Sequence, residues 1–474
     1  MAFLIGGANS AAADAAIITN SCRFNDGDSA YMLKEAGAGS RRTFTFNTWV
    51  KLGNLGIARY LFTSWNANND AGFTYLSLTD ADKIKFAGYS TTYLETTQVL
   101  RDPTAWYMLT LAVDTTSGTA DNRCRIYLNG PEITTFGTRN NPDQNDDLAF
   151  NQDGVDLVLA SNDYGGSKGN YHDGYLAETV WIDGTQYAAS NFGESNSDSP
   201  NIWQPVDVSG LTFGTNGFYL DYEDSANLGN DANGGTDLTE TNLAATDQTT
   251  DTPVNNFCTL NPLDGGVVNT SLEEGNCKIN STGDSSWGYW ASTFHLSTGK
   301  WYWEVKMITG SAAWFLGVVE SENLKWFHKA DVYPASSNGG HAIYKDGTKR
   351  PGTGSDAAYM AAYVGDDIIS IALDLDNNKV YFAKNGQWAD GSGNNDEASP
   401  NAFLDLTADL TASNPSSWKA IFNMDDNCDC EVNFGNPPYA NSSDAADEDG
   451  YGAFEYAPPS GYFSLCTKNL AEYG

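Results

Sequence analysis

The chain has 474 residues, and its 61 acidic against 25 basic side chains give a formal net charge of −36. Binding to nucleic-acid phosphates needs clustered Lys and Arg, so this charge argues against DNA or RNA partners. No stretch approaches the ~20 apolar residues that cross a bilayer, which argues against membrane insertion. Abundant aromatic residues (25 Tyr, 22 Phe, 13 Trp) without sustained helical periodicity predict an all-β protein. At this length we expect two domains.

Residues 1–20 are small, apolar and rich in Ala, and they carry too little bulk for a core of their own. They are equally consistent with a frayed end and with an N-terminal arm that anchors the chain to a larger assembly. No basic residue precedes the short apolar run, so we expect no secretory signal and synthesis in a cytoplasm.

Short alternating strands separated by Gly, Asn and Asp clusters fill residues 21–190, as in an antiparallel sandwich. Three of them are FTFNTWVKLG, the hairpin WYMLTLAVD…RIYLNG and the closing strand DGYLAETVWIDGTQY. These motifs resemble the laminin-G/concanavalin-A-like jelly roll. The resemblance implies a β-sandwich of that family over residues 21–190.

Residues 191–256 are dominated by Gly, Asn, Asp and Thr, with one embedded strand pair in LTFGTNGFYLDY. We interpret this segment as a structured connector that ends in a polar linker. LTFGTNGFYLDYEDSANLGNDANG, with its ending TDQTTDTPVNNF, resembles connectors in virion-associated proteins of tailed bacteriophages.

A second sandwich is expected over residues 257–466, followed by a C-terminal tail over 467–474. Its GKWYWEVKM strand, WFLGVV strand, GDDIISIALDLDNNKVYFAKNG hairpin and EVNFGNPPY stretch resemble the SPRY family. The resemblance implies a domain that recognises partner proteins or peptides through loops at one end.

The hairpin Gly365–Gly386 has a weaker copy upstream, because LTLAVD followed by RIYLNG parallels ISIALD followed by VYFAKNG. In the hairpin, residues 369, 371, 373 and 375 alternate on one face of a sheet. Asn377 and Asn378 tolerate left-handed backbone and predict the tight turn. The copies predict two related sandwiches in tandem.

No catalytic constellation stands out. Glucanases on this fold carry E-x-D-x-x-E along one strand, and the chain has no such strand. Its four His lie beside no nucleophile signature, and no phosphate-binding loop is present. The seven cysteines are an odd number, which leaves at least one thiol unpaired within the chain, and they lack zinc-site spacing. We therefore predict that the protein is not an enzyme.

Two loops combine aromatic rings with amides and carboxylates, which suits sugar stacking or Ca²⁺ coordination by oxygen ligands. The alternative is plain turn chemistry, since tight turns demand the same Asn, Asp and Gly. In the second sandwich, tryptophans beside polar loops are the candidates for an exposed contact surface. The candidate ligand-binding residues are Trp65, Asn66, Asn68, Asp70, Asp163, Tyr164, Asp173, Trp290, Trp326 and Trp388. No cofactor is implied, and Ca²⁺ is the one metal left open.

These observations predict a non-catalytic virion protein of a tailed phage, a fibre, spike or head-decoration subunit. Its partners would be host-surface glycans or neighbouring virion proteins, and further copies of itself, with a trimer expected because multivalency multiplies weak contacts. A polysaccharide lyase or hydrolase that acts during adsorption is the alternative from another class. A decoration protein that binds only its own capsid is the third.

Overall fold

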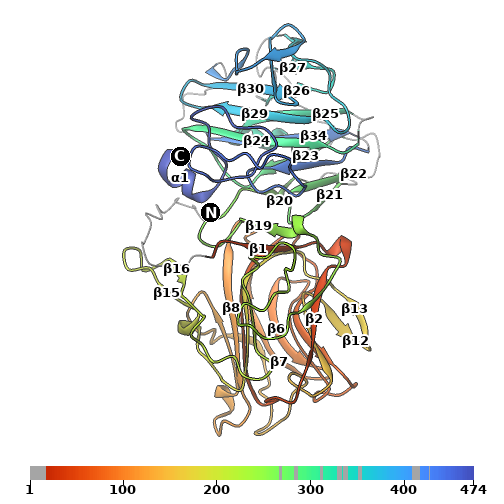
Figure 1. The fold of residues 1–474 in the computed structure, drawn as a ribbon, viewed down its shortest axis with the longest axis vertical. Coiled ribbons are helices and arrows are strands. Elements are labelled where there is room, and N and C mark those ends of the chain that lie inside the picture. The colour runs from red at the N-terminus through yellow and green to blue at the C-terminus, as the bar shows by residue number, and fades with distance from the viewer. Residues whose placement is uncertain are drawn as a thin grey trace. The chain divides into compact units, whose positions relative to one another are not determined.

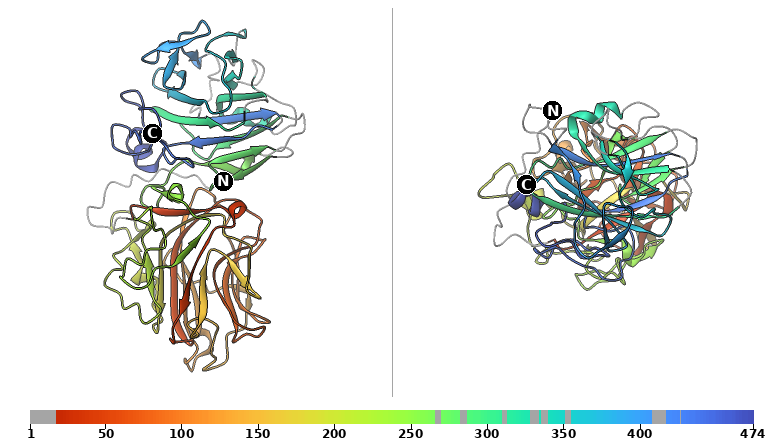
Figure 2. Two further views of the ribbon diagram at one scale, coloured as in Figure 1. Left: turned by 45° about the vertical axis from the view of Figure 1, so that its right-hand side comes forward. Right: turned by 90° about the horizontal axis from the view of Figure 1, so that it is seen from above.

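The computed structural model describes residues 18–265, 270–281, 287–309, 313–327, 334, 340–350, 355–407, 417–425 and 427–474. The chain divides between residues 254 and 255 into two units, called here the N-terminal and C-terminal units (Figure 1). Each is built from antiparallel β-sheets stacked as a sandwich, which confirms the predicted all-β fold of tandem sandwiches (Figure 2). The predicted arm, residues 1–20, lies outside the described residues except for its last three.

The N-terminal unit has two main sheets. Within its described residues, sheet A contains seven strands, in the order β19 (Gln248–Thr249), β1 (Ser21–Phe24), β14 (Gly174–Asp183), β3 (Thr43–Leu52), β8 (Trp106–Asp114) and β9 (Cys124–Leu128), with β17 (Phe218–Leu220) pairing β14. Sheet B contains eight, in the order β10 (Phe136–Arg139), β7 (Thr92–Val99), β6 (Lys83–Gly88), β5 (Phe73–Leu78), β4 (Arg59–Trp65), β11 (Val155–Leu159), β2 (Tyr31–Ala36) and β18 (Thr239–Thr241). Two small hairpins are formed by β12 (Asn162–Tyr164) with β13 (Ser167–Gly169), and by β15 (Gly193–Ser195) with β16 (Trp203–Pro205).

Sheet A is buried on both faces. Its inner face packs on sheet B through a core of aromatic rings, in which Phe62 lies 4.8 Å from Trp181 between ring centroids. Its outer face carries a second apolar cluster, where Trp49 of β3 is covered by residues such as Phe192 and Phe213 from the segment after β14. Among the described residues, no second apolar cluster covers the outer face of sheet B, which is therefore the broad open sheet surface of this unit.

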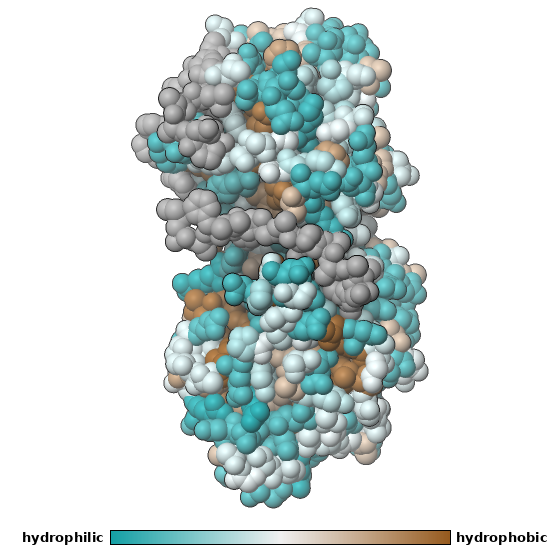
Figure 3. Space-filling model, turned by 90° about the vertical axis from the view of Figure 1, so that its left-hand side faces the viewer, coloured by the Kyte–Doolittle hydropathy of each residue, from teal (hydrophilic) through white to brown (hydrophobic). Residues whose placement is uncertain are grey.

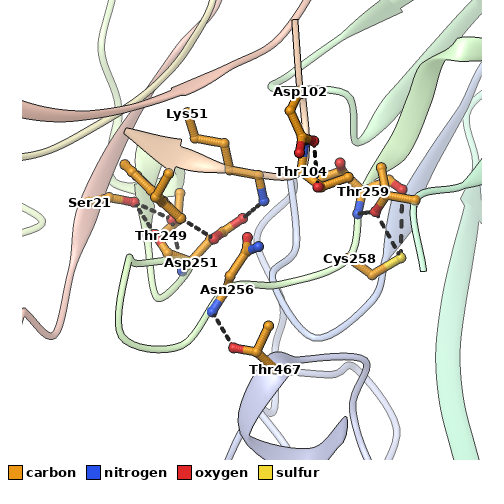
Figure 4. A network of polar contacts seen from close by, with 12 residues as sticks. Ser21, Lys51, Asp102, Thr104, Thr249, Asp251, Asn256, Cys258, Thr259 and Thr467 are labelled. Carbon is orange, nitrogen blue, oxygen red and sulfur yellow. Dashed lines mark hydrogen bonds and ion pairs between the residues drawn. The ribbon is translucent and has the colours of Figure 1, made fainter. Parts of the chain in front are cut away.

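Residues 191–254 fold into the N-terminal unit, whereas the sequence predicted a connector between domains. Strands β17, β18 and β19 extend sheets A and B. The end of the segment is fixed by polar contacts: Lys51 Nζ lies 2.6 Å from Asp251 Oδ2, and the hydroxyls of Ser21 and Thr249 lie 2.7 Å apart (Figure 4). Trp106 also donates its indole N–H to Asp251 at 3.0 Å. The segment is polar in composition, which is typical of a linker, but its polar groups bond to other residues of the same unit.

The C-terminal unit is a second two-sheet sandwich. Among its described residues, one sheet has seven strands: β20 (Leu260–Gly265), β23 (Gly288–Ser292), β34 (Trp418–Asp425), β25 (Ala313–Glu320), β26 (Gly340–Tyr344), β27 (Thr348–Arg350) and β28 (Ala357–Ala358). The other has nine: β21 (Thr270–Glu273), β22 (Lys278–Ser281), β35 (Cys430–Asn433), β24 (Lys300–Met307), β29 (Ile368–Asp374), β30 (Lys379–Lys384), β31 (Gln387–Ala389) and β32 (Asn395–Glu397), with β33 (Leu404–Asp405) pairing β30.

The predicted C-terminal tail forms the helix α1 (Thr467–Tyr473). The tail packs on its own unit, because Tyr473 stacks on Phe463 with ring centroids 3.8 Å apart. At the start of the unit, the backbone N–H of Asn256 donates to the Thr467 hydroxyl at 3.0 Å (Figure 4). The two ends of this unit are therefore joined. No helix in the described part of the chain is long and apolar enough to cross a membrane.

Both predicted hairpins are present, as β8 with β9 and as β29 with β30. In each hairpin, the side chain of an asparagine accepts a backbone N–H from the paired strand. Asn129 accepts the backbone N–H of Met108 at 2.8 Å, and Asn385 accepts that of Ile368 at 2.8 Å. Both asparagines have φ = 49°. The Asn-Gly ending is common to the two copies because each hairpin needs a residue with left-handed backbone at this position.

The turn between β29 and β30 supplies a stability test. Asn378 has φ = 54°, a left-handed conformation that penalises β-branched residues by about 1–2 kcal/mol. We expect Asn378→Val to lower the free energy of unfolding of the C-terminal unit by about that amount in urea titrations. Asn378→Gly is the matched control and should stay near wild type. Equal stability of the two variants would contradict the assignment.

Candidate functional site

A row of aromatic rings follows the outer face of sheet B. In β5, Leu76 and Leu78 point into the core, so the alternating Phe73 and Tyr75 point outward. The Tyr75 ring lies 4.8 Å from that of Tyr60 on β4 and 5.1 Å from that of Phe73. Five rings, Tyr60, Tyr75, Phe73, Tyr164 and Tyr89, form the surface called here the tyrosine face.

The exposed end of the tyrosine face is a stacked pair. Tyr89 and Tyr164 have ring centroids 6.2 Å apart and an interplanar angle of 8°. Each side chain is 43% exposed. The edge of Phe73 supports Tyr164, with centroids 5.6 Å apart. Flat, parallel, exposed rings are the surface on which an apolar sugar face can stack.

Asp70 fixes the turn that carries Tyr89. Its two carboxylate oxygens accept four hydrogen bonds, from the backbone N–H and hydroxyl groups of Ser90 and Thr91, at 2.6–3.3 Å. Partial burial raises the pKa of Asp70, but these hydrogen bonds outweigh it and leave the pKa below its ordinary value. Gly88 is required beside it, because a Cβ there would lie 2.7 Å from the Asp70 carboxylate.

The β12–β13 hairpin places Tyr164. Its turn residues Gly165 and Gly166 have φ of 67° and 76°, which suits glycine. Asp163 forms an ion pair with Lys168 across the hairpin at 2.9 Å. The Lys168 ammonium also lies 5.9 Å from the centroid of the Tyr31 ring on β2. Side-chain contacts therefore hold the hairpin against β2, and the Tyr164–Phe73 contact holds it against β5.

The loop after β4 borders the same surface. Trp65 is half-buried and donates its indole N–H to Asn68 at 3.2 Å, while Asn66 and Asn68 are exposed. Asp70 ends this loop and reaches the Tyr89 turn, so the two loops singled out from the sequence converge at the Tyr89–Tyr164 pair.

Asp173 does not join this surface. It is 1% exposed, and its carboxylate accepts the backbone N–H of Asn54 at 2.6 Å. Burial, together with repulsion from Asp26, raises the pKa of Asp173 to about 7, against the opposing pull of Arg59. Burial likewise lowers the pKa of the neighbouring His172 to about 3. A ligand cannot reach Asp173 in this fold, so its expected binding role is replaced by a structural one.

The tryptophans expected on the surface of the C-terminal unit are buried where the structure describes them. Trp290 is 6% exposed and lies in the main core, and Trp388 is 7% exposed within a smaller cluster on the nine-stranded sheet. The expectation of exposure is wrong for both, because indoles on strands beside polar loops still pack under neighbouring segments. The side chain of Trp326 lies outside the described residues.

Within the part of the chain that the structure describes, no group of three or more His, Cys, Asp or Glu side chains could hold a metal ion. All seven cysteines are buried, and none is in a disulfide in the structure.

Sequence reasoning missed the rings at the centre of the site. Tyr60, Phe73, Tyr75 and Tyr89 lie in or beside strands and are not among the candidate ligand-binding residues. The signal was present in FTYLSL, where alternation puts two aromatic rings on the face opposite the core leucines. The side of the strand that points outward depends on where the second sheet packs. The strand pattern alone therefore could not distinguish these rings from core residues.

Residues 25–185 match the family described as the concanavalin A-like lectin/glucanases superfamily. The matched residues fall within the stretch 21–190, for which the sequence resemblance implied a sandwich of this kind. No curated protein sequence matches the chain.

Solved structures show more distant similarity. The SPRY domain of human HERC1 is 13% identical, with 36% of this chain and 96% of that domain covered and a TM-score of 0.28. A second human SPRY domain is 13% identical, with coverages of 37% and 99% and a TM-score of 0.26. A Bacteroides ovatus ATCC 8483 protein described as a candidate carbohydrate-binding protein is 17% identical, with coverages of 47% and 58% and a TM-score of 0.34.

The buried carboxyl of Asp173 predicts a pH effect on stability. Its pKa is about 7 in the fold against an ordinary value of 3.8, so the folded state binds the proton more tightly. Its stabilising contribution is complete below about pH 4 and is lost as the pH rises through 7. We expect Asp173→Asn to gain stability over wild type from pH 5 to pH 7, by up to ~1.4 kcal/mol per pH unit in urea titrations. Asp80→Asn, at an exposed position, is the control. A constant difference across that range would refute the assignment.

Proposed function

We propose that this chain is a non-catalytic glycan-binding adhesion protein and that the tyrosine face holds the sugar. The observation that carries the proposal is the exposed, parallel Tyr89–Tyr164 pair on a domain that matches a lectin/glucanase superfamily. Sheet A cannot offer an equivalent surface, because its outer face is covered by its own chain.

The chemistry of the face fits a sugar. Aromatic rings stack on the C–H face of a pyranose, and hydroxyl and amide groups then fix its orientation. Tyr89 and Tyr164 supply rings with phenolic hydroxyls, while Asn66 and Asn68 add exposed amides at the rim. Because Asp70 and the Asp163–Lys168 pair hold both tyrosines in place, little conformational entropy is lost on binding.

The proposed function retains the expectation that the protein is not an enzyme. A glucanase of this fold needs paired carboxylates along one strand, and E-x-D-x-x-E does not occur in the sequence. The acidic residues beside the rings, Asp70 and Asp163, already bond neighbouring groups in the fold. Binding without cleavage is the role that these groups support.

The proposed setting is the virion of a tailed phage, in which the chain would be a fibre, spike or head-decoration subunit. The support is the resemblance of LTFGTNGFYLDYEDSANLGNDANG, with its ending TDQTTDTPVNNF, to virion connectors, and multivalency, which favours a homo-oligomer such as a trimer. We expect antibodies against this chain to label intact particles in immuno-electron microscopy, with head or tail labelling fixing the position. Unlabelled particles would refute the virion setting and leave the glycan proposal standing.

Tyr89→Ala tests the site. Loss of one stacking ring should weaken binding to a glycan identified on a printed array by about three- to tenfold in calorimetry. Asp70→Ala should weaken it too, because the Tyr89 turn loses four hydrogen bonds.

Phe403→Ala is the matched control, since it removes a 39% exposed aromatic ring from the C-terminal unit. If Phe403→Ala weakens binding and Tyr89→Ala does not, the tyrosine face is not the site.

The same incubations are assayed for reducing ends. Their release by wild-type protein would contradict the non-catalytic assignment and favour the hydrolase or lyase alternative.

A further inference from the structure

We infer that the tyrosine face selects uncharged glycans over anionic ones. The inference rests on the proposed function and deepens it by naming the ligand class. It follows from how the charged side chains of this surface are matched with one another, combined with the charge of the whole chain.

Each acidic group beside the rings already has partners in the fold. Glu95 on β7 lies 3.6 Å from Lys83 on β6, and Asp163 lies 2.9 Å from Lys168. The carboxylate of Asp70 accepts four hydrogen bonds. A ligand that approaches the rings therefore meets carboxylates that neighbouring groups already stabilise.

Lys85, a third lysine beside the rings, also has a carboxylate nearby. Lys85 stands directly opposite Glu95 in the β6–β7 register, and its ammonium lies 6.0 Å from the centroid of the Tyr75 ring. Three lysines, Lys83, Lys85 and Lys168, thus accompany the three carboxylates of Glu95, Asp163 and Asp70. These six formal charges cancel, and the described residues beside the rings show no cluster of cations that could clamp carboxylate or sulfate groups.

The net charge of the whole chain also disfavours the binding of anionic glycans. With a formal net charge of −36, it repels a polyanion at distances up to the Debye length, about 10 Å at 0.1 M salt. Figure 3 shows one side of the molecule, where hydrophilic residues predominate on the surface. An uncharged polymer experiences neither this repulsion nor a need for local counter-charge, and stacking on Tyr89 and Tyr164 needs no charge at all.

The test compares two sets of probes at 20 mM and 500 mM NaCl. Uncharged probes are β-glucan, dextran, mannan and chitin oligosaccharides, and anionic probes are alginate, polygalacturonate and hyaluronan oligosaccharides of equal length. We expect the best uncharged probe to bind with an affinity that salt changes less than about twofold. The best anionic probe should bind at least about tenfold more weakly at low salt. Tighter anionic binding that salt abolishes would overturn the inference.

A variant adds a second readout. Glu95→Gln leaves Lys83 and Lys85 without their shared carboxylate, so it should raise the affinity for the anionic probes several-fold at 20 mM NaCl and not at 500 mM. Unchanged anionic affinity, in a variant whose circular dichroism and unfolding midpoint match wild type, would contradict the charge-balance argument.

The outcomes separate the two proposals. Anionic binding that is tighter than uncharged binding and that Tyr89→Ala weakens would leave the tyrosine face as a glycan site and refute only the charge selection. No binding to any probe, or binding that Tyr89→Ala leaves intact, would refute the proposed function itself.

Discussion

Two-sided burial of sheet A is the constraint on which the N-terminal unit depends. One face of this sheet meets sheet B, and the other is covered by the segment that follows β14, where Phe192 and Phe213 pack against strand residues such as Trp49. A sheet covered on both faces offers its strands no open surface. Sheet B must therefore supply whatever broad surface the unit presents, and its outward residues include rings of the tyrosine face.

A binding surface needs rings that are exposed and yet hold their positions. Exposed tyrosines on free loops would lose rotamer entropy on binding, which weakens affinity. Here Tyr89 is held by a turn that Asp70 bonds four times, and Tyr164 by a hairpin that the Asp163–Lys168 pair closes. Asp70 and Asp163, which the sequence suggested as ligand contacts, instead hold the turn and the hairpin that carry the rings.

In the proposed function, the charged groups beside the rings also affect which ligands the rings accept. Pairing within the surface removes the strong local field that a charged sugar would need, and the acidity of the rest of the chain disfavours anions. Stacking then becomes the main attraction available. Asp70 and the Asp163–Lys168 pair position the rings, whereas Glu95 enters only the proposed charge selection, so Glu95→Gln is expected to change the preferred ligand class while the rings stay in place.

The sequence by itself determined the strands, the two hairpins with their Asn-Gly closures and the all-β architecture, because alternation and turn chemistry are local. It also found the two loops that carry Asp70 and Asp163. Tertiary structure alone decided that Asp173 and Trp290 are buried and that Tyr75 faces outward. It also decided that residues 191–254 cover and extend the first sandwich. Those outcomes depend on which surface a distant segment covers, and a strand's own pattern does not record its neighbours across the sandwich.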